Sequence, residues 1–277
     1  MNKKKKSVKT LIGEFLFAVL TVIILMPVYY FLIGSFKARK DIVLHPLTPN
    51  FEIGFKNFAY VWNRLHFPKA LLDTAIITVV SLLLVVALGS LAGFAIARVK
   101  RKSFTVFYSA LVALMVIPFI GCLIPLVKQS VSLGLYGSLT SVIVIQVAWN
   151  LPFATFLFVG FMEGIPKDLE EAAYIDGCSM FKTYVKVFIP LLSPVISTCC
   201  IRAGVGIWND YLCTASLVNQ VNTPTLMVGL YKFFYERGTE YGYAFAGIIL
   251  ASLPMIILFL CLQKNFIKGI TAGAVKG

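Results

Sequence analysis

Long apolar stretches recur six times along this chain, each near or beyond the roughly 20 residues that an α-helix needs to cross a bilayer. They lie near residues 11–34, 70–97, 104–127, 139–162, 187–208 and 243–262. Because backbone N–H and C=O groups in lipid need partners within their own segment, each stretch is expected to be helical. The pattern therefore predicts an all-α integral membrane protein with six transmembrane helices. Pro190 and Pro194 leave the start of the fifth span the least well defined.

The polar segments between these stretches differ in length. Two short links and three long loops connect the predicted spans: 98–103, 128–138, 37–68, 163–186 and 209–242. The first long loop contains an aromatic stretch, which predicts a short helix at the membrane surface, where aromatic rings prefer to lie. No internal repeat or low-complexity linker divides the chain. Residues 1–277 are therefore expected to form a single membrane domain with a polar C-terminal tail at 264–277.

Composition narrows the class of protein further. Of the 277 residues, 59% are hydrophobic and 13% are charged, against about 25% charged in ordinary soluble domains. This excludes a disordered chain and disfavours a soluble enzyme. The net charge of +13 would be compatible with binding to nucleic acid. However, fifteen Lys and Arg residues fall on the side of the predicted membrane that holds the N-terminus, and nine fall on the opposite side. The positive-inside rule then predicts a multi-pass protein with both termini cytoplasmic, and disfavours nucleic acid as a partner.

Residues that carry catalysis form no recognisable arrangement. The chain has no Gly-x-x-x-x-Gly-Lys-Ser/Thr phosphate loop, no His-Glu-x-x-His and no Gly-x-Ser-x-Gly. Its six cysteines form no Cys-x-x-Cys pair, and His45 and His66 are twenty-one residues apart. We therefore expect no catalytic residue, metal or cofactor in this chain. The energy for any transport is expected to come from a partner.

Residues 163–186 carry the most informative pattern in the chain, a short amphipathic helix, a glycine turn and a second amphipathic helix. Acidic residues fall in the first turns after Pro166, where they complement the positive end of the helix dipole. Gly177 fits a left-handed C-terminal cap. The second helix is expected to begin about Ser179, with Phe181 and Tyr184 as large apolar side chains on one face.

Two interpretations of this loop follow from its composition. Ala172 and Ala173 stand side by side and would let another backbone approach closely, so that the loop docks on a partner protein. The alternative is an amphipathic loop that lies on the lipid surface.

A family resemblance favours the first interpretation. Glu171-Ala172-Ala173, followed by Asp176, Gly177 and two later prolines, resembles the "EAA" signature of ABC importer permeases. Tyr184 stands where that signature usually has Phe. The tail 264–277 is similar to that of the maltose-transporter-like sugar permeases, specifically their shorter six-span subunit. Trp208-Asn209-Asp210 and Leu253-Pro254 also look like that subgroup.

The resemblance implies a type I importer in a bacterial plasma membrane. It implies as partners a second permease subunit, two cytoplasmic ATPase subunits that bind ATP and Mg, and an external sugar-binding protein. In that family the loop inserts into a groove on the ATPase and couples its closure to alternating access. The coupling residues implied are Glu171, Ala172, Ala173, Asp176, Gly177, Phe181 and Tyr184. The tail would reach between the ATPases, and residues 213–240 would probe the cleft of the binding protein.

Polar and aromatic residues within the predicted spans are candidates for a sugar pathway, because sugars are bound by aromatic stacking and hydrogen bonds. The candidates are Gln146, Trp149, Asn150, Arg202, Trp208, Asn209 and Asp210. The alternative role is hydrogen bonding between helices. Arg202 lies inside the fifth span, where an arginine costs about 2.5–3.5 kcal/mol on insertion scales unless it faces protein or water.

The leading hypothesis is thus a permease subunit of an ATP-driven sugar importer, with an oligosaccharide as the expected substrate. An importer permease for a non-sugar solute is the first alternative, which the C-terminal tail disfavours. A self-sufficient secondary transporter or channel, or a membrane-embedded enzyme, would be expected to carry paired intramembrane acids or a catalytic constellation, and the chain has neither.

Overall fold

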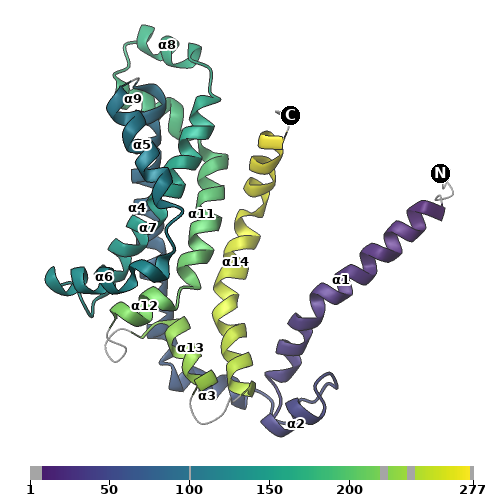
Figure 1. Cartoon of the computed structure of the whole chain (residues 1–277). Helices are drawn as coiled ribbons and strands as arrows, with labels where there is room; N and C mark the ends of the chain where they lie inside the picture. The colour runs from purple at the N-terminus through teal and green to yellow at the C-terminus, as the bar shows by residue number, and fades with distance from the viewer. Residues whose placement is uncertain (1–7, 100, 219–223, 236–240, 275–277) are drawn as a thin grey trace. The chain divides into compact units, whose positions relative to one another are not determined.

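The computed structural model describes residues 8–99, 101–218, 224–235 and 241–274, and the described part of the chain is built from helices (Figure 1). In chain order these are α1 Val8–Gly34, α2 Arg39–Leu44, α3 Lys56–Arg64, α4 Phe67–Arg98, α5 Lys102–Leu114, α6 Phe119–Ser132, α7 Leu139–Glu163, α8 Asp168–Ile175, α9 Met180–Thr183, the π-helix η1 Tyr184–Phe188, α10 Ile189–Leu191, α11 Ser193–Trp208, α12 Leu212–Leu217, α13 Leu226–Tyr235 and α14 Tyr241–Ala274. The prediction of an all-α chain is therefore confirmed for the described residues.

Single helices long and apolar enough to cross a membrane occupy four of the six predicted positions. Among the described residues they are Lys9–Gly34, Phe67–Arg98, Leu139–Glu163 and Tyr241–Cys261. The last of these is part of α14, which continues as one helix through most of the predicted tail to Ala274.

The other two predicted spans, near 104–127 and 187–208, are broken. Helix α5 meets α6 at an angle of 108°, so that α6 runs across the neighbouring helices rather than along them (Figure 1). The break coincides with Pro118, whose extended backbone precedes α6. The segment before α11 bends by 73° at Leu192, between Pro190 and Pro194. Proline has no backbone N–H to donate, which is why both breaks fall beside prolines.

The chain separates into two compact units. The first comprises Met1–Phe67 and Gly229–Leu253, and the second comprises Pro68–Val228 and Pro254–Gly277. The second unit contains all the candidate coupling and pathway residues.

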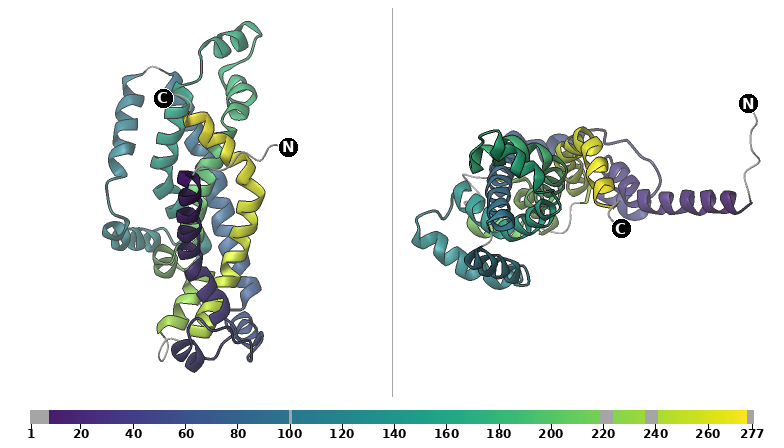
Figure 2. Two further views of the ribbon diagram at one scale, coloured as in Figure 1. Left: turned by 90° about the vertical axis from the view of Figure 1, so that its right-hand side faces the viewer. Right: turned by 90° about the horizontal axis from the view of Figure 1, so that it is seen from above.

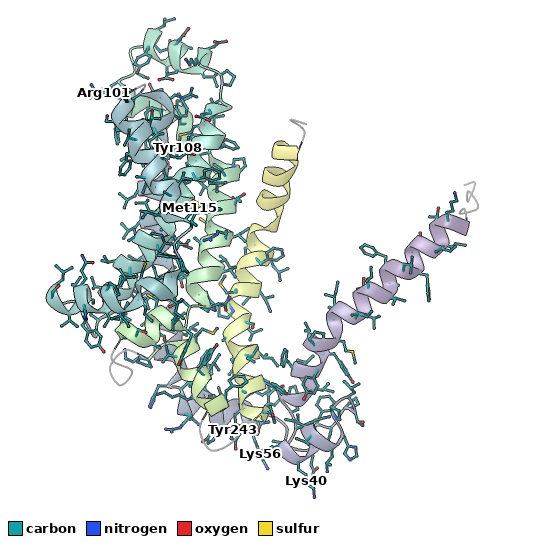
Figure 3. All side chains as sticks on the ribbon, in the orientation of Figure 1. Lys40, Lys56, Arg101, Tyr108, Met115 and Tyr243 are labelled. Carbon is teal, nitrogen blue, oxygen red and sulfur yellow. The ribbon has the colours of Figure 1, made fainter. Side chains whose placement is uncertain are left out.

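The first unit holds the helix expected in loop 37–68, which is α3. Its Asn57 side chain donates to the backbone carbonyls of Ser35 (2.8 Å) and Lys37 (3.0 Å). Its Tyr60 ring stacks on that of Tyr243, with centroids 4.1 Å apart. Tyr243 lies at the start of α14 and is labelled in Figure 3. These contacts attach α3 to both segments of the unit.

The second unit rests on close packing of α4 against α7. Gly89 and Gly93 lie four residues apart on α4, and a methyl group at these positions would come within 2.9 Å of Ala154 Cβ and 2.7 Å of Phe158 Cβ. Small residues at this spacing let two helix backbones approach, which is the usual basis of helix packing in membranes. Within this unit, α8 lies at one end of the bundle, whereas α6 and α12 lie toward the other (Figure 1, Figure 2).

Candidate functional site

Helix α8 ends in the left-handed turn that the sequence predicts. Gly177 has φ 75°. Its N–H donates to the carbonyl of Tyr174 (3.0 Å), and the N–H of Cys178 donates to the carbonyl of Ala173 (2.9 Å). This pair of bonds is the Schellman motif, which satisfies carbonyls at a helix C-terminus. The predicted conformation of Gly177 is therefore confirmed, and it sets the direction in which the chain leaves α8.

The helix that follows begins where it was expected. The Ser179 hydroxyl accepts the N–H of Lys182 (3.4 Å) and caps α9, which starts at Met180. From Tyr184 to Phe188, however, the helix widens to η1, a π-helix. Short π-helical turns inside α-helices are frequent at functional sites, and they rotate the side chains that follow.

The exposed face of α8 and α9 is apolar at its tip. Ile175 is 87% exposed and Phe181 is 68% exposed. We call this surface the apolar tip and define it by its exposed large apolar residues, Leu169, Tyr174, Ile175, Met180 and Phe181. Among the residues named from the family signature, Glu171, Ala172, Asp176 and Gly177 are also exposed. The sequence analysis missed Ile175, although an apolar residue just before a glycine cap marks the end of an amphipathic helix.

Two of the predicted coupling residues, Ala173 and Tyr184, are buried. Ala173 is buried, as expected for a helix in which neighbouring residues point about 100° apart. Tyr184 is only 7% exposed, and its hydroxyl lies 2.7 Å from the Ser90 hydroxyl on α4. Its ring packs against Phe94, with centroids 5.2 Å apart. Tyr184 thus attaches η1 to α4, and its ring centroid lies 6.3 Å from that of the exposed Phe181, so the two apolar side chains lie side by side.

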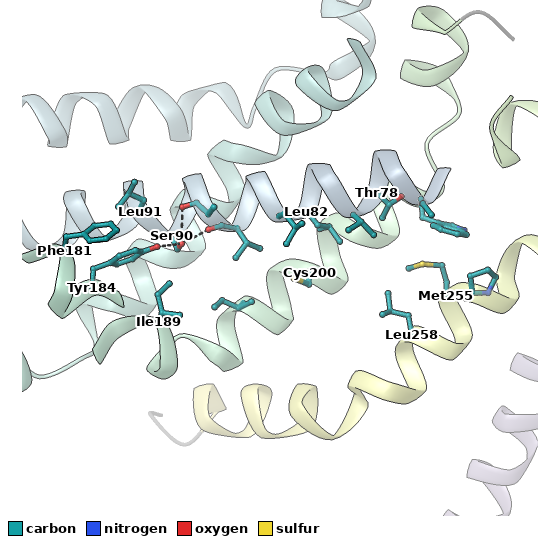
Figure 4. A pocket seen from close by; sticks show the side chains of 18 residues that line it. Thr78, Leu82, Ser90, Leu91, Phe181, Tyr184, Ile189, Cys200, Met255 and Leu258 are labelled. Carbon is teal, nitrogen blue, oxygen red and sulfur yellow. Dashed lines mark hydrogen bonds between the residues drawn. The ribbon is translucent and has the colours of Figure 1, made fainter. Parts of the chain in front are cut away.

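A cavity of about 770 Å³ lies beside this contact, between α4, η1, α11 and the second half of α14 (Figure 4). Its lining is apolar apart from the hydroxyls of Thr78, Ser90 and Tyr184 and the indole of Trp208. A sugar needs many hydrogen bonds, so this cavity is chemically unsuited to hold one.

Arg98, the last residue of α4, is a functional candidate that the sequence analysis counted only as a basic charge. Its guanidinium Nη2 donates to the carbonyls of Met162 and Ile165, both at 2.9 Å, just where α7 ends. Its Nε lies 3.5 Å from a carboxylate oxygen of Glu170 on α8, and its guanidinium lies 4.9 Å from the centre of the Phe188 ring. No local sequence signal predicts these partners, which lie more than sixty residues away.

The pathway candidates on α7 and α11 come together around Arg202. The guanidinium Nη1 donates to Oδ1 of Asn150 (3.2 Å), and the same guanidinium lies 4.4 Å from the centre of the Phe153 ring. Asn150 in turn donates to the backbone carbonyl of Gln146 (2.8 Å) and lies 3.4 Å from its side-chain oxygen. Three of the predicted residues thus form one hydrogen-bonded chain.

Arg202 also lines a smaller cavity of about 190 Å³, which we call the Arg202 pocket. Its walls come from the C-terminal end of α5, the start of α6, α7 and α11, and include Met115 at the bend (Figure 3) and Trp149. The Trp149 ring meets Phe119 edge to face, with centroids 4.9 Å apart. The pocket therefore joins an indole, a guanidinium and apolar surface, which is a combination suited to a sugar ring.

Trp208, Asn209 and Asp210 have different surroundings. Trp208 is buried and lines the larger cavity, whereas Asn209 is exposed where α11 ends. The Asp210 carboxylate accepts the N–H of Cys213 (3.3 Å) and both the N–H and the hydroxyl of Thr214 (2.8 Å each), which caps α12. Burial, with a smaller contribution from Asp210, raises the pKa of the Cys213 thiol, so this thiol stays neutral. Asp210 thus serves to fix α12.

The residues that the structure describes contain no group of three or more His, Cys, Asp and Glu side chains able to hold a metal ion. The described geometry instead offers an apolar docking surface at one end of the bundle and a mixed polar and aromatic pocket within it.

Comparison with known proteins identifies the family. Residues 85–272 match the model of the binding-protein-dependent transport system inner membrane component. The chain is 37% identical to the melibiose/raffinose/stachyose import permease protein MelC of Bacillus subtilis (strain 168), with 91% of each chain covered. It is 33% identical to the probable starch degradation products transport system permease protein AmyC of Thermoanaerobacterium thermosulfurigenes, with 99% of each covered.

The fold has a counterpart among solved structures. A chain in the crystal structure of a bacterial ABC transporter involved in the import of the acidic polysaccharide alginate matches with a TM-score of 0.80 and 19% sequence identity, covering 96% of this chain and 99% of that chain. This likeness confirms the predicted importer-permease fold. With the family model spanning α8, η1 and the Arg202 pocket, the chain belongs to the binding-protein-dependent inner membrane components of ABC transporters, a family of multi-pass permeases.

Proposed function

We propose that this chain is a permease subunit of an ATP-driven importer that takes up a sugar, with an oligosaccharide as the substrate class. The relatives named for melibiose, raffinose, stachyose and starch degradation products support this substrate. The observation that carries the proposal is the apolar tip, because it leaves large apolar side chains exposed at the end of a polar loop. Such a surface is typical of a protein interface.

The apolar tip is the surface that docks on an ATPase subunit. Burying an exposed Phe or Ile side chain contributes about 1.5–3 kcal/mol, so Ile175 and Phe181 together supply a substantial part of the docking free energy. Glu171, Ala172 and Asp176 are exposed beside them and complete the docking face. Gly177 directs α9 relative to α8.

The complete transporter contains two ATPase subunits that bind ATP and Mg, a second permease and an external sugar-binding protein. Both termini of this chain lie in the cytoplasm, on the side of the apolar tip. The tail 264–277, of which 275–277 lie outside the described residues, reaches toward the ATPases. Residues 213–240, of which 219–223 and 236–240 likewise lie outside them, face the binding protein. The charge asymmetry along the sequence supports this orientation.

Within the membrane, the Arg202 pocket is the part of the pathway that contacts the sugar. Trp149 offers a ring for stacking, and the Arg202 guanidinium offers hydrogen-bond donors to sugar hydroxyls. The hydrogen bond between Arg202 and Asn150 keeps the guanidinium satisfied when no sugar is present.

Reconstitution tests the proposal directly. The chain is purified with its second permease and ATPase subunits, placed in proteoliposomes, and supplied with ATP and the binding protein. We expect ATP-dependent uptake of labelled raffinose or maltotriose and no uptake of amino acids, phosphate or polyamines. Uptake of one of those solutes instead of a sugar would establish the alternative, a non-sugar importer. Uptake by this chain alone without ATP would refute the coupled mechanism.

A further inference from the structure

Arg98 lies at the junction of four elements. It is the last residue of α4, its guanidinium bonds the end of α7, and it approaches α8 through Glu170 and η1 through Phe188. The side chain is only 4% exposed. Hydrogen bonds and a nearby opposite charge offset the cost of burying a guanidinium, so these contacts link the four elements through one side chain.

The contact with α7 is a C-terminal cap. The carbonyl of Met162 belongs to the last turn of α7, and the carbonyl of Ile165 follows it in the turn beyond Gly164. Carbonyls at a helix end lack partners within the helix and carry the negative end of its dipole. The Arg98 charge therefore fixes both the end of α7 and the direction in which the chain leaves it toward α8.

The contact with α8 is different in kind. Nε of Arg98 lies 3.5 Å from Oε2 of Glu170 but forms no hydrogen bond with it, whereas charge-assisted hydrogen bonds are usually about 2.7–2.9 Å long. The Nε–Oε2 distance is therefore longer than a hydrogen bond by less than an ångström, and a small movement of α8 can shorten it. Glu170 points inward with 16% exposure, while its neighbour Glu171 is exposed. The two adjacent acids therefore face different partners.

Helix α7 leads from this cap to the Arg202 pocket. Asn150 lies thirteen residues before Glu163, which is roughly 20 Å along a helix. Pro152, which lines the pocket, cannot donate to the carbonyl of Ala148 and so makes this point the place where α7 bends most easily. A displacement of the far end of α7 is thus concentrated at the pocket.

We propose that Arg98 is a positioning residue that passes movement of α8 to α7, with Glu170 as the group through which α8 acts on it. This inference rests on the proposed function, since it assumes that an ATPase moves α8. Movement of α8 changes the Arg98–Glu170 distance, the guanidinium carries the α7 end with it, and the Arg202 pocket opens or closes at Pro152.

The test uses the complete transporter in proteoliposomes, with Glu170→Gln as the principal variant and Asp168→Asn as the matched control. Asp168 is an exposed acid in the same first turn of α8, so both changes remove the same charge near the helix N-terminus. Four quantities are measured: retention of the ATPase subunits, basal ATP hydrolysis, stimulation of hydrolysis by the sugar-loaded binding protein, and ATP hydrolysed per sugar imported. Because Arg98→Lys removes the planar fork and endangers folding, it serves as a second variant, tested only for agreement with Glu170→Gln.

We expect Glu170→Gln to retain the ATPases and basal hydrolysis at wild-type levels. Stimulation by the loaded binding protein should fall about tenfold, within the range typical of coupling between two sites, and ATP hydrolysed per sugar should rise. Asp168→Asn should behave as wild type. Normal stimulation and stoichiometry in Glu170→Gln would overturn the inference, as would a parallel loss of ATPase retention, which marks a merely structural role. Absence of ATP-dependent uptake in the wild type would instead overturn the proposed function.

Discussion

Replacing Gly177 tests how much the backbone conformation of this residue contributes to coupling. There is space for a side chain at this position, and only the backbone dihedral angle φ disfavours one. A Cβ at this position meets no atom within 4 Å, yet φ is +75°. For most residues the left-handed region costs about 1–2 kcal/mol, and for a β-branched residue it is a genuine outlier. Asn is the exception, since its side chain tolerates this region. The series Gly177→Asn, Gly177→Ala and Gly177→Val thus varies strain at an exposed position.

The expected effect follows from the Schellman motif that Gly177 closes. A strain of 1–2 kcal/mol lowers the fraction of molecules with the native turn by a factor of roughly 5–30 where the turn is marginally stable. Without the turn, α9 leaves α8 in a different direction, so that Ile175 and Phe181 no longer keep the relative positions that docking requires. We therefore expect sugar-stimulated ATP hydrolysis and uptake to decrease in the order Gly, Asn, Ala, Val.

The assay is uptake and stimulated hydrolysis in proteoliposomes, with sugar affinity of the isolated binding protein as a control that should not change. Insertion into the membrane is checked by yield of the assembled permease pair. If Val is as active as Asn, or Asn as impaired as Val, the left-handed turn is not what the loop requires and the argument from φ fails.

Three further changes test the remaining parts of the proposal. Phe181→Asp puts a charge into a desolvated interface at a cost of several kcal/mol, so fewer ATPase subunits should remain bound to the purified permease. Phe181→Leu should retain them, and equal retention by both variants would show that Phe181 is not part of the docking surface. Arg202→Leu should leave insertion intact but reduce uptake or change sugar preference, because it removes the donor to Asn150; unchanged uptake across a panel of sugars would exclude Arg202 from the pathway. A single Cys at Ser179, in a variant lacking the six native cysteines, should resist impermeant thiol reagents in intact cells, and its labelling from outside would invert the topology.

Features governed by neighbouring residues could be predicted from the sequence. The turn at Gly177 and the cap at Ser179 depend on hydrogen bonds that span only a few residues. The pairing of Gln146 with Asn150 follows from their spacing of one helical turn. The positions of the apolar spans likewise follow from composition within a single helix length.

Features governed by distant residues could not. Tyr184 was expected on the docking face, but its hydroxyl partner Ser90 lies ninety-four residues earlier and its ring packs against Phe94. Arg98 resembles any other basic residue at the end of a span until α7 and α8 are placed beside it. Pro118 indicates a break in the third predicted span, but the local sequence does not predict that the two helices meet at 108°.

The long-range contacts that the sequence does not predict determine whether the loop 163–186 can move independently of the helices. Tyr184 ties η1 to Ser90 in the last third of α4, and Arg98 ties the other side of the loop to the end of α4. Helix α4 itself cannot slide freely on α7, because Gly93 lets Phe158 approach so closely that even a methyl group would clash. A force applied at the apolar tip is therefore borne by α4 and α7 together. The loop is attached to both helices and does not move as an independent flap, and the place where α7 bends most easily is Pro152, which lines the Arg202 pocket.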